Sequence, residues 1–384
     1  MKIVHLCLCS FFPDGFAYQE NMLPKFHKQQ GHDVEVIASL VTFDEHGKPT
    51  LMDKPSAYIN EHGIPVTRLD YKAPKKLFSV LRRYEGFEAA LEKAAPDIIF
   101  VHGCQFLDVD VVARYAKAHI NVKVFVDNHA DFTNSATNPL SKYVLHGVIW
   151  KHCAKTIEQY AKKMYGVLPC RVDFLKNVYG MPADKCELLV MGADDDAVIA
   201  ADTPEIRKEI RVKYNIADDD FLVITGGKID AWKTQTLLLM QAVKNIENPK
   251  VKLIVFGSVT EELMPKVKEL ADGEKVQYIG WVKSEESYKY FAVSDLVVFP
   301  GRHSVFWEQV AAQGIPMLCK KWDGTTHVDV GGNVQFLTED SVREIESKIR
   351  ELLIPENYVV MKEAAAEGKK VFLYSDISRR SIEA

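Results

Sequence analysis

The sequence lacks the features that mark several large classes of protein. It has no C-x-x-C pair, and its seven cysteines are an odd number scattered over 384 residues, which argues against a disulfide framework. We therefore expect a reduced, cytoplasmic compartment. No segment approaches the roughly 18 consecutive apolar residues of a membrane-spanning helix. A net charge of −5 gives no global reason to expect a nucleic-acid partner.

Several catalytic and cofactor motifs are also missing. No G-x-G-x-x-G segment follows a strand-like run, which argues against a Rossmann dehydrogenase. No Asp-x-Asp motif of the metal-dependent type stands out, so we expect neither a metal site nor a bound cofactor. Low-complexity tracts are absent as well. What is present, 47% hydrophobic and 26% charged residues, is typical of a soluble globular protein.

The chain is too long for one ordinary core, so two domains are expected. Strand-like apolar runs alternate with helical segments in both halves, which predicts α/β domains with parallel, doubly wound sheets. The predicted strands cover residues 3–9, 33–39, 65–69, 97–102 and 122–127, then 221–225, 251–256, 276–279, 296–299 and 316–320. Helices are predicted at 77–93 and 157–164, and the acidic stretch 194–204 is interpreted as an irregular linker. The expected domains are 1–198 and 199–384.

Residues 225–233 carry the strongest functional signal, with the sequence TGGKIDAWK. They follow the strand-like run 221–224 and precede an apolar helical pattern that begins near residue 237. A turn from strand to helix is where α/β folds bind phosphate, and two lysines five residues apart suit a diphosphate. The alternative interpretation is an ordinary loop with solvated lysines.

Residues 294–316 form the second signal, with the sequence SDLVVFPGRHSVFWEQVAAQGIP. A strand is predicted to end at Pro300, and a helix is predicted to begin near Ser304, which is a suitable N-cap residue. The helix should stop before Gly314, because Pro316 opens the next strand.

These segments resemble glycosyltransferases of family 4. GKI-x-x-x-K at 227–233 is similar to the family's GRL-x-x-x-K, with Lys228 in the position usually taken by Arg. Gly-His-x-Val-x-Val at 31–36, Gly-Ala-Asp at 192–194 and the Glu-x-x-x-x-Gly-x-Pro-like block ending at Pro316 support the resemblance. It implies the GT-B fold, in which two Rossmann-like domains face a central cleft. The N-terminal domain would bind the acceptor and the C-terminal domain the nucleotide sugar, with the last helix able to pack back on the N-terminal domain.

The resemblance also implies a set of donor-binding residues. Gly227, Lys228 and Lys233 would hold the diphosphate, and a glutamate on the helix before Gly314 would hold the ribose. The family usually has two glutamates eight residues apart, but Pro300 stands eight residues before Glu308. Counting back from Gly314 places the ribose ligand at Gln309. We take Glu308 as the ribose ligand and leave Gln309 as the alternative.

Four further residues are assigned to the donor site with an ordinary structural alternative beside each. His303 and Ser304 would contact the donor, or would be a loop histidine and a helix cap. Trp281 would stack on the base, or would cover the edge of the core. Gly15 loosely matches the glycine of the family's first strand-to-helix loop, which approaches the phosphates.

His129 resembles a histidine that touches the transferred sugar in family members. It follows the strand 122–127, at an edge of the sheet where open α/β folds bind ligands. We name His129, Lys228, Lys233 and Glu308 as catalytic candidates. His102 also ends a strand and ranks below His129. A metal-ligand set or a structural loop is the alternative.

The implied activity is transfer of a sugar, without a metal and with retention at the anomeric carbon. The donor would be a nucleotide-diphosphate sugar, and the acceptor would be a glycan, a lipid-linked molecule or a small molecule, as in polysaccharide biosynthesis. Residues 72–83 are basic and laced with apolar side chains, which suits either contact with the inner face of a membrane or a solvated amphipathic helix. A non-catalytic nucleotide-sugar-binding module and a GT-B epimerase or phosphorylase remain as alternatives.

Overall fold

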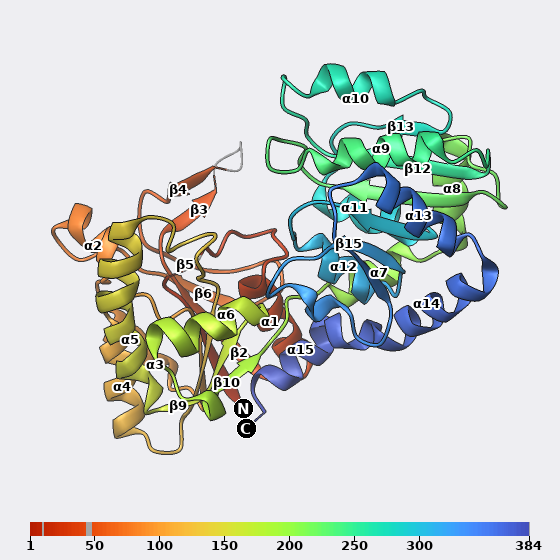
Figure 1. Cartoon of the computed structure of the whole chain (residues 1–384). Coiled ribbons are helices and arrows are strands. Elements are labelled where there is room, and N and C mark those ends of the chain that lie inside the picture. The colour runs from red at the N-terminus through yellow and green to blue at the C-terminus, as the bar shows by residue number, and fades with distance from the viewer. Residues whose placement is uncertain (10, 44–47, 384) are drawn as a thin grey trace. The chain divides into compact units, whose positions relative to one another are not determined.

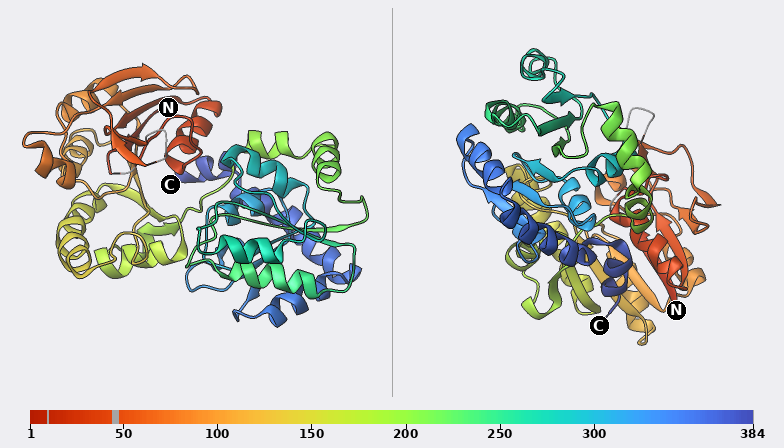
Figure 2. Two further views of the ribbon diagram at one scale, coloured as in Figure 1. Left: turned by 90° about the horizontal axis from the view of Figure 1, so that it is seen from above. Right: turned by 90° about the vertical axis from the view of Figure 1, so that its right-hand side faces the viewer.

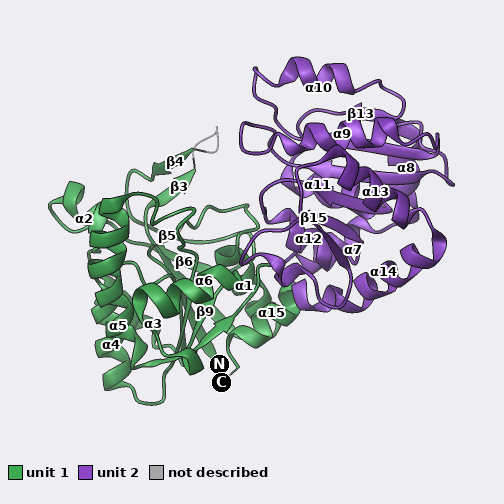
Figure 3. Cartoon of the chain, in the orientation of Figure 1, with its two compact units in different colours: residues 1–191, 374–384 green, residues 192–373 purple. Residues whose placement is uncertain are grey.

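The computed structural model describes residues 1–9, 11–43 and 48–383. The chain forms two compact units, which Figure 3 distinguishes by colour: unit 1 contains residues 1–191 and 374–384, and unit 2 contains residues 192–373. Both termini lie in unit 1 (Figure 2). No helix among the described residues is both long enough and apolar enough to cross a bilayer.

Unit 1 is built on an eight-stranded sheet in the order β10-β9-β8-β7-β1-β2-β6-β5, in which only β5 is antiparallel to its neighbour. The strands are β1 (Lys2–Cys7), β2 (Asp33–Ala38), β5 (Ser56–Ile59), β6 (Pro65–Arg68), β7 (Ile98–His102), β8 (Lys123–Asn128), β9 (Ala161–Gly166) and β10 (Cys186–Leu188). A separate antiparallel pair consists of β3 (Val41–Phe43) and β4 (Pro49–Leu51). All five residues of β7 are buried, as expected for a parallel strand covered on both faces.

The helices of unit 1 flank this sheet (Figure 1). They are α1 (Gln19–Gln29), α2 (Lys75–Leu81), α3 (Phe87–Ala94), α4 (Val109–Ala118), the π-helix η1 (Leu140–Trp150), α5 (Lys151–Glu158), α6 (Pro169–Phe174), the short turns η2 (Leu175–Tyr179) and η3 (Ala183–Lys185), and α15 (Tyr374–Ser381). The last helix, α15, lies beside α1, and Gln30 donates a hydrogen bond to the Ser375 carbonyl at 2.8 Å.

Unit 2 contains an all-parallel six-stranded sheet in the order β13-β12-β11-β14-β15-β16. The strands are β11 (Phe221–Gly226), β12 (Val251–Phe256), β13 (Val276–Tyr278), β14 (Leu296–Phe299), β15 (Met317–Lys320) and β16 (Val334–Leu337). The helices are α7 (Asp195–Ala201), α8 (Pro204–Lys213), α9 (Gln235–Asn245), α10 (Met264–Leu270), α11 (Ser284–Ala292), α12 (Phe306–Ala312), η4 (Thr326–Val328), α13 (Val342–Leu352), α14 (Pro355–Gly368) and η5 (Lys369–Phe372). Both sheets are Rossmann-like, as the sequence predicts.

The strand orders fix where ligands can bind. In unit 2 the chain runs outward from β11 to β13 and then returns to β14, so the order reverses between β11 and β14. In unit 1 the reversal lies between β1 and β7. Open α/β sheets bind ligands at the carboxyl ends of the strands at such a switch point.

Three local predictions are wrong. The predicted helix at 157–164 is the end of α5 followed by β9, because Met164 and Tyr165 are buried and pair with Val126 and Asp127 of β8. The predicted irregular linker at 194–204 contains α7, which the Asp194 carboxylate caps by accepting from the Asp196 N–H at 3.2 Å. The predicted helix at 77–93 is broken into α2 and α3, with Gly86 at φ 69° between them.

Candidate functional site

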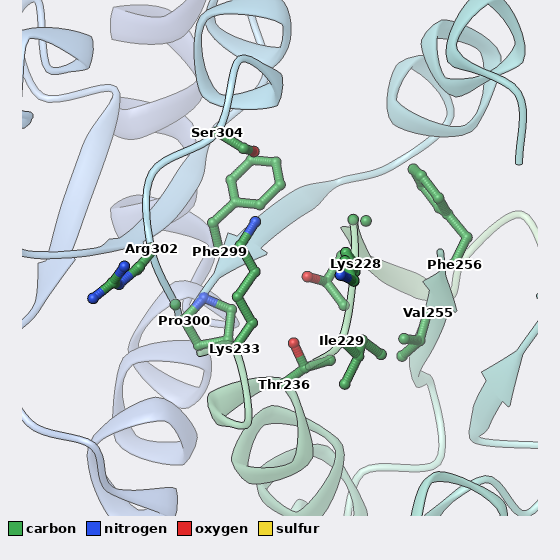
Figure 4. Close-up of a pocket in the computed structure, with 14 residues that line it drawn as sticks. Lys228, Ile229, Lys233, Thr236, Val255, Phe256, Phe299, Pro300, Arg302 and Ser304 are labelled. Carbon is green, nitrogen blue, oxygen red and sulfur yellow. The ribbon is translucent and has the colours of Figure 1, made fainter. Parts of the chain in front are cut away.

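A pocket in unit 2 lies at the switch point between β11 and β14 (Figure 4). Its walls come from the loop after β11, the loop after β14, the first turn of α9 and the end of β12. The lining residues are Thr225, Gly226, Gly227, Lys228, Ile229, Lys233, Thr236, Val255, Phe256, Phe299, Pro300, Gly301, Arg302 and Ser304. The two segments that the sequence singles out therefore form one site.

The two predicted lysines have different environments in this pocket. Lys228 is 63% exposed, and its Nζ lies 3.5 Å from Oδ2 of Asp230. Lys233 is half-buried, and this burial lowers the pKa of its ammonium group, although Asp230 partly offsets the effect. Asp230 also shapes the loop, because its Oδ1 accepts from the Trp232 N–H at 2.9 Å. The loop thus presents one exposed and one half-buried cation.

Two glycines let the loops approach each other. Gly227 has φ +126°, a conformation that other residues rarely adopt, and a Cβ there would lie 3.9 Å from the Lys233 Nζ. Gly257, which follows β12, has φ +132°, and a Cβ would fall 1.8 Å from the carbonyl oxygen of Gly227. A side chain at Gly257 would therefore displace the loop that carries Lys228.

The loop after β14 contributes Arg302 and Ser304. The Arg302 side chain extends away from the other labelled residues (Figure 4), and its guanidinium lies 4.4 Å from the centroid of the Trp232 ring. Ser304 is not the N-cap of α12, contrary to the sequence prediction: the cap is Val305, and its side chain accepts no hydrogen bond. The Ser304 hydroxyl therefore remains available to line the pocket.

Glu308 is fully buried in the first turn of α12. Its Oε1 lies 2.8 Å from Nε2 of His303 and 2.8 Å from Nε2 of His327, while its Oε2 has no partner among the described residues. Burial would raise the pKa of the Glu308 carboxyl, but the two histidines outweigh it and hold the pKa at about 2. Glu308 is thus a buried anion that orients His303, whose side chain is 13% exposed.

Gln309, the alternative ribose ligand, faces a different neighbour. It is 5% exposed, and its Nε2 donates to the Ser287 hydroxyl of α11 at 3.0 Å. Glu308 is fully buried and Gln309 is 5% exposed, so neither side chain lies open to a ribose as the structure stands. The assignment to Glu308 stays a prediction.

The same three residues are a possible metal-binding group. Each of these residues, His303, Glu308 and His327, has one ligand atom that lies within 4.8 Å of the ligand atoms of the other two. Two imidazole nitrogens and a carboxylate can bind a transition metal. As described above, the two imidazoles are instead hydrogen-bonded to the carboxylate.

The remaining donor-site candidates lie outside the lysine pocket. Trp281 is 68% exposed, so it does not cover the core edge and its indole face is free to stack. Gly15 has φ +77° at an exposed loop, and its N–H donates to Glu61 Oε1 at 2.8 Å. It does not line the pocket of unit 1 described next.

His129 lines a pocket at the switch point of unit 1. This pocket is lined by Cys9, Phe11, Tyr18, Glu20, Arg82, His102, Gly103, Gln105, His129, Ala130, Asn134, Ser135, His146 and Trp150. The Nε2 atom of His129 lies 3.4 Å from Asp127 Oδ2 and 4.0 Å from Glu20 Oε1. Burial would lower the pKa of His129, but the two carboxylates outweigh it and raise that pKa. The two carboxylates therefore favour the cationic form of His129, whose Nε2 has no hydrogen-bond partner among the described residues.

The sequence analysis missed most of the residues that support these side chains. Asp127 and Glu20 fix the charge of His129, and His327 shares the carboxylate of Glu308. His5 lies inside an apolar strand, in KIVHLC of β1. A histidine in such a position indicates buried polar contacts, and this signal was available in the sequence.

Family comparisons cover most of the chain. Residues 206–368 match the family described as Glycosyl transferases group 1, and residues 26–188 match the family described as Glycosyl transferase 4-like domain. None of the curated proteins searched matches the chain.

Solved structures of the same fold match over nearly the full length. HepE of Anabaena, in complex with UDP, is 16% identical with a TM-score of 0.67, covering 99% of this chain and 98% of that chain. A glycosyltransferase from Rickettsia africae is 15% identical with a TM-score of 0.68, covering 99% and 96%. WaaG, a glycosyltransferase involved in lipopolysaccharide biosynthesis, is 15% identical with a TM-score of 0.62, covering 98% of each chain.

These matches agree with the two parallel α/β sheets. The fold is GT-B, as the sequence resemblance implies. The chain belongs to the group 1, or glycosyltransferase 4-like, family of retaining enzymes, which use a nucleotide-sugar donor.

Proposed function

We propose that the protein transfers a sugar from a uridine-diphosphate sugar to a lipid-linked acceptor at an anionic membrane surface, with retention and without a catalytic metal. The observation that carries the donor half is the convergence of Lys228 and Lys233 on one pocket at the switch point of unit 2. The choice of uridine rests on the fold neighbour HepE, whose structure contains UDP.

The two lysines would act on the leaving group. The negative charge on the diphosphate grows as the bond to the sugar breaks, so fixed cations stabilise the transition state more than the ground state. Because Lys233 is half-buried, the local dielectric is lower, and its charge stabilises the diphosphate more strongly than the charge of a solvated lysine does. No carboxylate is needed as a nucleophile if the leaving phosphate accepts the proton of the acceptor hydroxyl.

His129 would contact the transferred sugar. It faces a pocket with polar groups from several elements, and the carboxylates of Asp127 and Glu20 hold its imidazole in place. As a cation it donates a hydrogen bond to a sugar hydroxyl. The lysines belong to unit 2 and His129 to unit 1, which assigns the donor phosphates to one unit and the sugar and acceptor contacts to the other.

The lipid-linked acceptor is inferred from a surface of unit 1 that we call the η1–α2 face. It has exposed apolar side chains on η1 and α2: Leu140 at 66%, Tyr143 at 66%, Val148 at 64%, Leu77 at 50% and Val80 at 58%. Segments 71–84 and 132–157 contain no acidic residue but carry Lys and Arg. Exposed apolar groups among cations suit an anionic lipid surface.

The η1–α2 face adjoins the pocket that contains His129. The guanidinium of Arg82 lies 5.5 Å from the centroid of the Trp150 ring, which joins the end of α2 to the end of η1, and both residues line that pocket. A lipid-anchored sugar on the membrane would thus meet the pocket near its mouth.

A donor panel tests the proposal. The full chain is incubated with UDP-, GDP-, ADP- and dTDP-sugars, with and without liposomes that contain lipid-linked acceptors, and released nucleotide is measured. We expect release from one UDP-sugar, slow alone and faster with acceptor liposomes. Binding without any release would favour a non-catalytic module. Conversion of the donor sugar into its epimer would favour an epimerase.

A further inference from the structure

A chain of buried histidines crosses unit 1 behind His129. His5 is at its centre: its Nδ1 lies 3.0 Å from Nε2 of His102, and its Nε2 lies 3.0 Å from Nδ1 of His27. All three side chains are 0% exposed. The sheet register explains the first contact, because His5 of β1 pairs with Phe100 of β7, so that His102, two residues further, shares its face.

The chain has a defined partner at each end. His102 Nδ1 lies 3.0 Å from Oδ2 of Asp127, the residue opposite it on β8. At the other end, His27 Nε2 lies 2.9 Å from the carbonyl oxygen of Ser378 and 3.2 Å from the hydroxyl of Ser381, both on α15. The hydrogen-bonded chain therefore connects the last helix with the carboxylate that holds His129.

Counting protons shows that this chain has two fully satisfied arrangements. In the first, the Ser381 hydroxyl turns away from the Ser378 carbonyl oxygen, which lies 2.8 Å from it, and donates to His27. Each histidine donates from Nδ1 toward Asp127, which is a carboxylate. All three imidazoles are then neutral Nδ1–H tautomers.

In the second arrangement every bond is reversed. A protonated Asp127 donates to His102, each histidine donates from Nε2, and His27 donates to the Ser378 carbonyl. All three imidazoles are then neutral Nε2–H tautomers, and no ring nitrogen lacks a partner.

The two arrangements differ by one proton. To pass from the first to the second, one solvent proton enters at His27 Nε2, and three protons each cross one hydrogen bond toward Asp127. Asp127 becomes a neutral acid and no longer attracts the His129 cation, which then loses to solvent the proton on Nε2, the ring nitrogen 3.4 Å from Asp127 Oδ2. A lone buried carboxylate could be neutralised only by leaving a neighbouring donor or acceptor unmatched.

We propose that His5, His27 and His102 are positioning residues, which act through Asp127 to set the charge that His129 presents to the transferred sugar. The role of His129 in this statement rests on the proposed function; the two-state hydrogen-bond chain does not. Ser381 terminates the chain: its hydroxyl donates to His27 in the first arrangement, in which Asp127 is charged, and to the Ser378 carbonyl oxygen in the second.

The charges around Asp127 favour the first arrangement at rest, whereas the 2.9 Å contact of His27 Nε2 with the Ser378 carbonyl oxygen favours the second. Burial would raise the pKa of Asp127, but His129 and His102 outweigh it and lower that pKa, while burial lowers the pKa values of His5 and His27. Gln19 also donates to Asp127 Oδ2 at 3.2 Å. The other titratable or charged groups around His129 are Glu20, Arg171, Cys9, Arg82 and His146.

The test reads the imidazole tautomers directly. Full-length protein labelled with ¹⁵N-histidine is examined by long-range proton–nitrogen correlation, which distinguishes Nδ1–H from Nε2–H rings. We expect His5, His27 and His102 to share the Nδ1–H tautomer at neutral pH. Mixed tautomers among the three rings in the unmodified protein would overturn the proposal.

A matched pair of serine variants sharpens the test. Ser381→Ala removes the hydroxyl that donates to His27, so all three rings should change together to Nε2–H. Ser378→Ala is the control: its hydroxyl contacts Gln30 and Ser375, and its carbonyl is unchanged, so the tautomers should stay as they are. A change confined to His27 in Ser381→Ala would contradict the coupled chain.

Kinetics separates this proposal from the proposed function. Ser381→Ala should shift the pH profile of kcat by at least half a pH unit while leaving the donor KM unchanged, because the donor phosphates are held by unit 2. If the enzyme proves not to transfer sugars, the tautomer pattern still decides whether the chain exists. If transfer is found and the profile does not move, the chain has no influence on His129.

Discussion

The Oε1 atom of Glu308 lies 2.8 Å from Nε2 of His303, and this contact couples a buried anion on α12 to the loop beside the lysine pocket. This contact gives Glu308 a second candidate role, orienting His303, beside the predicted role of binding the ribose. A carboxylate that is fully buried orients a neighbouring imidazole at least as readily as it binds a ribose. Substitution at this position therefore tests both roles.

Glu308→Gln should raise the donor KM more than it lowers kcat, because a contact made equally in ground and transition states changes binding rather than chemistry. Steady-state kinetics with varied donor measures both constants. Gln309→Ala is the matched comparison: it should reduce the free energy of unfolding, by about 1 kcal/mol for the lost hydrogen bond to the Ser287 hydroxyl, and leave KM unchanged. The Ser287 hydroxyl keeps its bond to the Ser284 carbonyl. The opposite pattern would mean that the ribose ligand is Gln309.

The lysines carry a second prediction. Lys228→Ala and Lys233→Ala should each lower kcat/KM by about 10²–10³-fold, the usual cost of losing one electrostatic contact to a developing charge. Lys266→Ala on α10 is the control, since Lys266 lies outside the pocket and contacts Glu269. Wild-type kinetics in both pocket variants would remove the basis for assigning the diphosphate to this loop.

The sequence pattern predicted both sheets through the alternation of strands and helices, and it predicted the strand-to-helix turn with two lysines at residues 225–233. It could not predict the contacts of Glu308, since His327 approaches from a turn 19 residues later in the chain. The contact between His27 and Ser378 joins residues 351 positions apart. Such pairs depend on how helices pack on the sheet, which no local pattern encodes. The strand β9 was missed because AKKMYG contains helix-compatible lysines.

Metal dependence is a separate question, because His303, Glu308 and His327 can be arranged as metal ligands. We expect sugar transfer to persist after dialysis against EDTA, since two lysines already supply the charge that a divalent ion would bring to the diphosphate. Activity is measured before and after chelation, with Mn²⁺, Mg²⁺ or Zn²⁺ restored. Loss in EDTA followed by recovery with one of these ions would overturn this prediction.

Buried neutral histidines make stability depend on pH. Burial lowers the pKa of His146 to about 4, while an unfolded histidine titrates near 6.5. Below pH 6.5 the unfolded state binds more protons, so this contribution to stability is complete above that pH and is lost as the pH falls toward 4. From pH 7 to pH 4.5 the loss should be about 2–3 kcal/mol for this residue.

Urea unfolding of His146→Gln measures that contribution. The variant is expected to be less stable at pH 7, because the contacts of His146 with Ser135 and Tyr179 change, but its stability should fall less steeply toward pH 4.5. His152→Gln is the control, because His152 is exposed. An unchanged slope in His146→Gln would show that His146 is already charged in the folded protein.

The η1–α2 face gives the last prediction. Leu140→Ser together with Val148→Ser should weaken co-sedimentation with phosphatidylglycerol-containing liposomes by about 10- to 100-fold, because each exposed apolar side chain that enters the interface contributes about 1 kcal/mol or more. Ile120→Ser is the matched control: Ile120 is 87% exposed but follows α4, outside this face. Lys76→Ser should weaken binding further, by about 1 kcal/mol, and reduce its salt dependence. Lys75 is left unchanged because its Nζ is paired with Asp70 Oδ2 at 2.7 Å. Arg82 and Arg83 are left unchanged, since they bond to Gln105 and Asp108 within unit 1. If the wild-type protein shows no salt-sensitive binding to these liposomes, the acceptor is not presented by a membrane through this face.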